Sequence, residues 1–154
     1  MGILPGKIRD VNLPLHPDGD KKHRTAIDAR RGMSSLTNLC VMERFNRHTP
    51  VEAIPRTGRT HQIRVHLAAL SRPRAADPLY CDGQPVQLSE SECQFKGKKK
   101  RENPLLSRFG LHSSSLTLMH PTSDRELNFI TPYPEDLTTT LSHPRQNLII
   151  NKPC

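Results

Sequence analysis

The pattern of apolar and polar positions divides the N-terminal half of the chain into short strands. Residues 8–15 alternate in part between apolar and polar and meet Pro14, which is typical of an edge strand because proline cannot donate to a sheet ladder. Leu36–Phe45 is apolar at most positions, and the polar turn Asn46–Thr49 separates it from Val51–Ile54. This arrangement predicts a hairpin whose second strand leads into a glycine-containing turn.

The C-terminal half repeats this pattern once. Ser115–His120 alternates as a strand, Pro121–Asp124 is a turn, and Glu126–Ile130 follows as the returning strand. Pro134–Asp136 has the composition of a helix start, and we expect a short helix over Leu137–Leu141. The chain of 154 residues, with 34% hydrophobic residues and 14 prolines, predicts one domain with a small core and many interrupted elements.

Between these halves lies the turn that precedes the most regular helical pattern. Gly58 is expected to allow a sharp reversal, and Thr60 is a good N-cap for a helix that starts at His61. The free amides of a helix start, together with the guanidinium of Arg59, favour an anion such as a phosphate or a carboxylate. On spacing alone, a solvated structural corner remains the alternative interpretation.

The helix itself is predicted to be amphipathic. Residues placed at 100° intervals put Ile63, Leu67 and Leu70 on one narrow stripe. Arg64 and His61 fall together on the adjoining face. We therefore expect one face to be buried and its neighbour to offer a guanidinium and an imidazole to a ligand.

Charge points to a polyanionic partner. Twenty-three Lys and Arg residues against 15 Asp and Glu residues give a formal net charge of +8, which favours nucleic acid through long-range attraction and counterion release. The densest basic run contains Lys96, Lys98, Lys99, Lys100 and Arg101. This run is either a flexible solvated loop or a clamp on RNA phosphates.

Several classes of protein are disfavoured. Cys40, Cys81, Cys93 and Cys154 form no Cys-x-x-Cys pair, so we expect free thiols and no zinc or other metal site. No apolar run approaches the length of a membrane span, and the first residues lack a signal-peptide pattern. A cytoplasmic protein without a membrane partner is the expectation.

The segment Thr57-Gly-Arg-Thr-His-Gln-Ile-Arg-Val-His-Leu67, followed by Asp77-Pro-Leu-Tyr80, resembles the RluA-type RNA pseudouridine synthases. The resemblance extends over most of residues 6–141. We therefore interpret residues 1–141 as a C-terminal portion of that family's catalytic domain, and residues 142–154 as a tail of unclear role.

Two features near this segment bear on its local structure. The family has glycine where this chain has Ala76, and alanine resists positive φ angles. Asp77 stands before a proline, so a capping or turn role is favoured for its carboxylate. Pairing of Asp77 with Arg64 or Arg74 is the alternative.

The resemblance implies a fold and a chemistry. It implies an α+β fold with a mixed, mainly antiparallel sheet and few short helices, apparently incomplete. It also implies isomerisation of uridine in ribosomal or transfer RNA by one aspartate, without a cofactor. The residue matching Arg64 pairs with that aspartate in the family. The other implied roles are RNA-backbone contacts by Arg59, His61 and Gln62, and apolar packing under the active site by Leu111.

The aspartate itself is not found by its motif. The family carries it in a His-Arg-Leu-Asp sequence, which this chain lacks, and in His23-Arg-Thr-Ala-Ile-Asp28 the aspartate comes two residues too late. Asp28 is therefore only a second-choice nucleophile. Three explanations stay open: a truncated enzyme, a short protein completed by a second chain, or a non-catalytic RNA-binding module. Missing strands would expose sheet edges, which predicts dimerisation or poor solubility.

Overall fold

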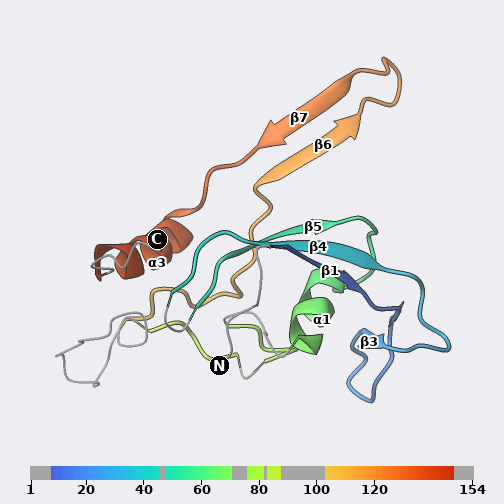
Figure 1. The fold of residues 1–154 in the computed structure, drawn as a ribbon, viewed down its shortest axis with the longest axis horizontal. Coiled ribbons are helices and arrows are strands. Elements are labelled where there is room, and N and C mark those ends of the chain that lie inside the picture. Colours follow the sequence, from blue (N-terminus) through green and yellow to red (C-terminus); the bar gives the residue numbers. More distant parts are fainter. Residues whose placement is uncertain (1–7, 46–47, 71–75, 82, 88–102, 148–154) are drawn as a thin grey trace.

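Among the residues that the structure describes, short strands and two helices are connected by loops (Figure 1). The computed structural model describes residues 8–45, 48–70, 76–81, 83–87 and 103–147. The strands are β1 (Ile8–Asn12), β2 (Leu15–His16), β3 (Ala26–Ile27), β4 (Leu36–Val41), β5 (Val51–Pro55), β6 (Ser115–Met119) and β7 (Glu126–Ile130), and the helices are α1 (Gln62–Ala69) and α3 (Glu135–Asn147). All pairings between these strands are antiparallel, which confirms an α+β fold with an antiparallel sheet.

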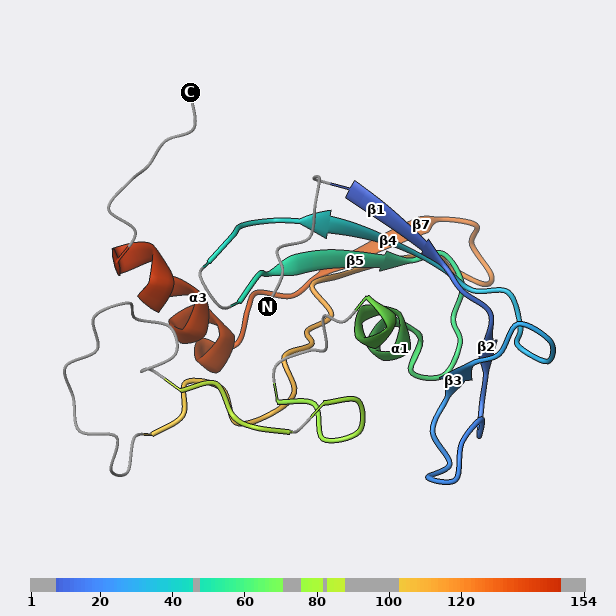
Figure 2. The same ribbon diagram turned by 60° about the horizontal axis from the view of Figure 1, so that its bottom comes forward.

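The largest sheet has the order β1-β4-β5, and α1 lies across one of its faces (Figure 2). Val11 of β1, Leu39 of β4 and Leu67 of α1 form the buried cluster between the two layers. Ile63 and Leu70 pack around this cluster, so the predicted apolar stripe is confirmed. Because α1 is held by this stripe, its other faces and the preceding turn take fixed positions at the end of β5.

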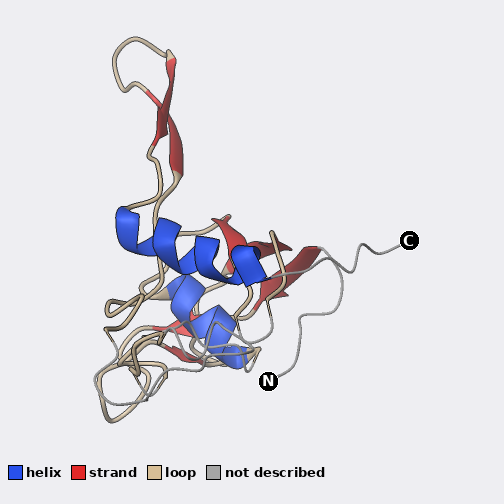
Figure 3. Ribbon diagram, turned by 90° about the vertical axis from the view of Figure 1, so that its left-hand side faces the viewer, coloured by secondary structure: helices blue, strands red, loops and turns tan. Residues whose placement is uncertain are grey.

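The hairpin of β6 and β7 stands away from the rest of the protein (Figures 1 and 3). Its register places Leu116 opposite Phe129 and Leu118 opposite Leu127, so these four apolar side chains share one face. Leu116 is 53% exposed and Phe129 is 51% exposed. The hairpin is confirmed as predicted, but its apolar face has no covering layer among the described residues. A two-stranded hairpin of this kind is marginally stable alone in water.

Replacing both Leu116 and Phe129 by threonine should reduce self-association of the protein. Threonine suits a strand, and both positions are already half exposed, so the free energy of unfolding should change by only about 0.5 kcal/mol per site. Sedimentation velocity over a range of concentrations measures the association. The control is Ile54→Thr, an exposed apolar residue of β5. Equal association of the hairpin variant and the wild type would contradict the prediction.

Some boundaries differ from those predicted. Helix α3 begins next to Pro134 as expected but continues past Leu141 to Asn147, so it crosses the expected limit between residues 1–141 and the tail. The residues after Leu141 are polar and include Pro144, so they carry no helical periodicity that the sequence could reveal. The run Lys96–Arg101 and residues 148–154 lie outside the described residues.

Candidate functional site

The turn after β5 is organised differently from the prediction. Helix α1 begins at Gln62, and His61 before it adopts a left-handed conformation with φ 55° and forms no side-chain cap. Thr60 is therefore not the N-cap. Gly58 has no positive φ, and a Cβ at that position would meet nothing within 4 Å, so the turn does not depend on glycine there. The bonds that hold the turn come instead from Gln62.

Gln62 connects the turn to β4. Its Oε1 accepts hydrogen bonds from the Thr57 hydroxyl at 2.7 Å and from the Arg59 amide at 3.1 Å. Its Nε2 donates to the Leu36 carbonyl and the Thr37 hydroxyl, both at 2.9 Å. The side chain is 4% exposed. The amide of Gln62 is therefore buried and hydrogen-bonded inside the protein, and its position gives no support to the predicted RNA contact.

His66 continues this buried network, and no pattern in the sequence indicated its role. The residue is fully buried, with Nδ1 2.9 Å from the Thr37 hydroxyl and Nε2 3.2 Å from the Leu13 carbonyl. Since a carbonyl only accepts, Nε2 must carry the proton and Nδ1 must accept one from Thr37. Burial lowers the pKa of His66, although the Leu13 carbonyl acts in the opposite direction. The imidazole is therefore a neutral cross-link between α1 and the sheet.

The lowered pKa of His66 predicts loss of stability in acid. The unfolded chain takes up this proton near the ordinary pKa of 6.5, and the folded protein takes it up only at lower pH. The stabilisation is thus complete above pH 6.5 and declines as pH falls from 6.5 towards the folded pKa. NMR titration of the imidazole C–H signal should give a midpoint below 6.5, and a midpoint at or above that value would contradict the assignment.

Arg64 is held by a carboxylate of this chain. Its Nε donates to Asp77 Oδ2 at 3.1 Å and its Nη2 to Oδ1 at 2.8 Å. The side chains are 13% and 1% exposed, so the pair is largely removed from water. Asp77 Oδ1 also accepts the backbone amides of Leu79 and Tyr80. Asp77 therefore has both of the roles that the sequence had offered as alternatives.

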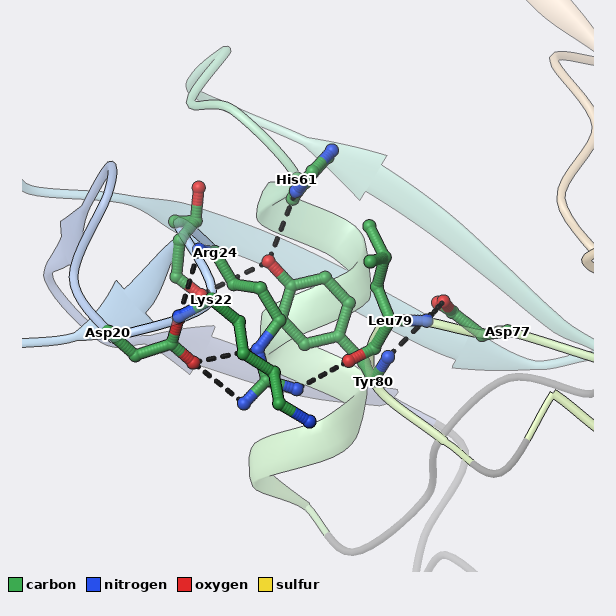
Figure 4. A network of polar contacts seen from close by, with 8 residues as sticks. Asp20, Lys22, Arg24, His61, Asp77, Leu79 and Tyr80 are labelled. Atoms are coloured by element: carbon green, nitrogen blue, oxygen red, sulfur yellow. Dashed lines mark hydrogen bonds and ion pairs between the residues drawn. The ribbon is translucent and has the colours of Figure 1, made fainter.

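Two aromatic rings border the Arg64 guanidinium. Its central carbon lies 5.0 Å from the ring centre of Tyr80 and 5.5 Å from that of Phe109. Figure 4 shows the Tyr80 hydroxyl reaching His61, whose Nδ1 is 3.1 Å away. The hydroxyl donates to the Thr25 carbonyl at 3.1 Å, and burial raises the pKa of Tyr80, so the phenol stays protonated at neutral pH. Phe109 carried no signal in the sequence, whereas Tyr80 belonged to the recognised motif.

The loop between β2 and β3 contacts the segment that carries Asp77 and Tyr80. Arg24 forms an ion pair with Asp20 at 2.6 Å and donates from Nη1 to the Leu79 carbonyl (Figure 4). Its guanidinium carbon is 5.7 Å from the Tyr80 ring centre. Arg24 is thus a bridge between this loop and the segment that carries Asp77.

Asp28 lies in a local turn. Its Oδ1 accepts the backbone amides of Arg30 at 2.9 Å and Arg31 at 3.0 Å, and its Oδ2 accepts from Arg31 Nε. The Arg31 amide, followed by the Arg30 amide and the Arg31 side chain, lowers the pKa of Asp28 to about 2. Both oxygens serve the turn, and none of these bonds reaches Arg64. The position gives no support to Asp28 as a nucleophile.

The other predicted residues take varied positions. Arg59 is half-buried and donates from Nε to the Ser34 carbonyl at 3.2 Å. Leu111 is half-buried, and its carbonyl accepts a bond from Arg108. Ala76 adopts φ 55°, so alanine occupies a left-handed conformation that glycine would take without strain.

Within the described ranges, the structure shows neither a metal-binding cluster nor a membrane-spanning helix. No group of three His, Cys, Asp or Glu side chains there is arranged to hold a metal ion. Neither described helix has the length and apolar character needed to cross a membrane.

Comparison with known proteins identifies the family. The family model described as RNA pseudouridylate synthase matches residues 5–69, which include β1 to β5 and the whole of α1. The ribosomal large subunit pseudouridine synthase D of Xanthomonas campestris is 33% identical over 94% of this chain and 41% of its own length. The dual-specificity RNA pseudouridine synthase RluA of Vibrio cholerae is 30% identical over 92% of this chain and 52% of its own length.

A solved structure agrees with these sequence matches. Human RNA pseudouridylate synthase domain containing 1 superposes with a TM-score of 0.57 and 27% identity, and the match covers 86% of this chain and 51% of that one. This chain therefore spans about half or less of the length of these relatives. The shared motif around Arg64, the shared fold and the sequence identity agree, and the chain belongs to the RNA pseudouridine synthase family.

Proposed function

We propose that this chain takes part in the isomerisation of uridine to pseudouridine in ribosomal or transfer RNA, in the cytoplasm. In this reaction the bond from the ribose C1′ to N1 of uracil breaks and a bond from C1′ to C5 forms. The hydrogen at C5 leaves as a proton and N1 takes up a proton, so the product is an isomer of the substrate. The observation that carries the proposal is the position of Arg64, which lies in the family's motif and is held rigidly at the start of α1.

A guanidinium can bind carboxylates along more than one edge. The edge formed by Nε and Nη2 is occupied by Asp77, and Nη1 takes part in neither of those bonds. In the proposed function, Asp77 anchors Arg64, and Nη1 faces the aspartate that the family uses in catalysis. Asp77 itself is unsuited to attack a substrate, because it is 1% exposed and also binds two backbone amides.

The net charge of +8 supports RNA as the partner. Arg59 and His61 belong to the turn beside Arg64, and the proposal assigns them contacts to the RNA backbone, together with the basic run Lys96–Arg101. An extracted base needs such contacts, because unstacking it must be offset by binding of the flanking phosphates. A second chain that covers the open hairpin and supplies the aspartate also fits the proposal.

Replacing Arg64 by lysine should abolish most isomerisation while RNA affinity stays within about twofold. Lysine keeps the charge but loses the planar fork, and removal of one preorganised electrostatic group lowers kcat by about 100-fold. The assay measures release of tritium from C5 of uridine in a ribosomal RNA transcript. Arg31→Lys is the matched control, because Arg31 is an exposed arginine of a local turn.

The same assay separates the competing explanations. Isomerisation by the wild type that survives in Asp28→Ala would remove Asp28 as nucleophile. RNA binding without isomerisation would favour a non-catalytic RNA-binding module, the second candidate that the basic composition supports. Full activity of Arg64→Lys would overturn the proposed role of Arg64.

A further inference from the structure

The Asp77 carboxylate does not by itself fix the orientation of the Arg64 guanidinium. A two-bond fork holds the guanidinium close to the carboxylate plane, but both groups can still tilt together. The rings of Tyr80 and Phe109 lie within cation–π distance of the guanidinium carbon, at 5.0 Å and 5.5 Å, and are close enough to restrict such a tilt. These rings come from segments far from α1 in the sequence, at positions 80 and 109.

The Tyr80 side chain is held in place by hydrogen bonds to its hydroxyl and to its backbone amide. Its backbone amide donates to Asp77, its hydroxyl donates to the Thr25 carbonyl, and His61 Nδ1 lies 3.1 Å from that hydroxyl. Because the phenol has one proton and gives it to the carbonyl, the His61 nitrogen must donate to the phenol oxygen. Phe109 has no polar group to fix its ring, and it is 43% exposed.

We propose that Tyr80 is a positioning residue for Arg64, holding the guanidinium plane so that its Nη1 edge faces the catalytic carboxylate. The attraction between a cation and the negative face of an aromatic ring supplies the holding force. This inference rests on the proposed function, and it adds that the ring, rather than the hydroxyl, is what the reaction requires.

Three variants distinguish the contribution of the Tyr80 ring from that of its hydroxyl. Tyr80→Phe keeps the ring and removes the bonds to Thr25 and His61. Tyr80→Leu removes the ring. Incorporation of 3,4,5-trifluorophenylalanine at position 80 keeps the shape but weakens the negative face, so it remains informative if Tyr80→Leu fails to fold. The matched control is Tyr133→Leu, an exposed tyrosine with no contact to Arg64 among the described residues.

The first measurement does not depend on catalysis. NMR hydrogen exchange of the Arg64 Nε–H should be slow in the wild type and stay within about threefold in Tyr80→Phe. It should accelerate by about tenfold in Tyr80→Leu and in the trifluorinated protein, the change expected from loss of a partly buried cation–ring contact. Equal exchange in the wild type and the trifluorinated protein would overturn the proposal.

The second measurement determines kcat and KM separately. In a positioning role, the trifluorinated protein should lose about tenfold in kcat with KM for RNA within about twofold, and Tyr80→Phe should restore kcat. A rise in KM alone would assign Tyr80 to RNA binding and overturn the inference. If no variant and no wild-type protein isomerises uridine, the proposed function fails, while the exchange measurement still decides whether Tyr80 holds Arg64.

Discussion

Asp77→Ala should lower the free energy of unfolding by about 3–5 kcal/mol, the range measured when one partner of a buried ion pair is removed. The substitution leaves the Arg64 guanidinium, 13% exposed, without its carboxylate. It also leaves the amides of Leu79 and Tyr80 without the acceptor that they share. Urea unfolding followed by circular dichroism measures the change.

The chain offers a matched control for this prediction. Arg108 and Asp136 form a fork of the same kind, with bonds of 2.7 Å and 2.9 Å, but their side chains are 41% and 35% exposed. Asp136→Ala should therefore cost under about 1 kcal/mol, because solvent screens an exposed pair. Equal losses from the two substitutions would show that burial does not set the strength of the Arg64–Asp77 pair.

Asn at position 77 refines the result. Asp77→Asn keeps a carbonyl oxygen for the two turn amides but removes the negative charge. Its loss of stability should lie between those of the wild type and Asp77→Ala. A loss as small as that of Asp136→Ala would show that the turn bonds, rather than the ion pair, carry the energy of this site.

The two hairpins and the apolar stripe of α1 could be predicted because each depends on a local period. Strand residues alternate every two positions, and the stripe of Ile63, Leu67 and Leu70 follows the helical period. The contact between Arg64 and Asp77 joins residues that are 13 positions apart, and a periodic pattern of apolar residues cannot reveal such a contact. Sequence analysis could therefore offer this pairing only as an alternative to a turn role for Asp77.

The buried polar network was missed for a different reason. A helical wheel assigns polar side chains to the solvent side, so it has no means of placing Gln62 and His66 inside. Both are buried because the short helix lies close to the sheet, where Thr37 and the Leu36 carbonyl of β4 and the Leu13 carbonyl after β1 offer partners. A polar residue becomes a core residue when its bonding capacity is met there, and that depends on tertiary structure.

This network sets the position of the candidate site. Gln62 ties the turn that carries Arg59 and His61 to β4, and His66 ties the next turn of the helix to the same strand. Arg64 lies between these two cross-links on α1. The part of α1 that carries Arg64 is thus anchored to the sheet by buried hydrogen bonds, and Asp77 binds its guanidinium.

Gln62→Ala should lower the free energy of unfolding by about 2–4 kcal/mol, because it removes four hydrogen bonds and leaves buried groups of Leu36 and Thr37 without one partner each. Asn38→Ala is the control, since Asn38 is only partly buried, makes solvent-exposed side-chain bonds to Asp10 and Arg56, and should cost under about 1 kcal/mol. Urea unfolding measures both variants.

RNA affinity then distinguishes a structural Gln62 from an RNA-binding one. At a temperature where Gln62→Ala remains folded, its affinity for a ribosomal RNA transcript and the salt dependence of that affinity should match the wild type, because a buried amide makes no phosphate contact. A weaker affinity with unchanged stability would return Gln62 to the RNA-binding surface. Gln62→Glu sharpens the comparison: its second oxygen would face the Leu36 carbonyl in place of a donor, so this nearly isosteric variant should be at least as unstable as Gln62→Ala.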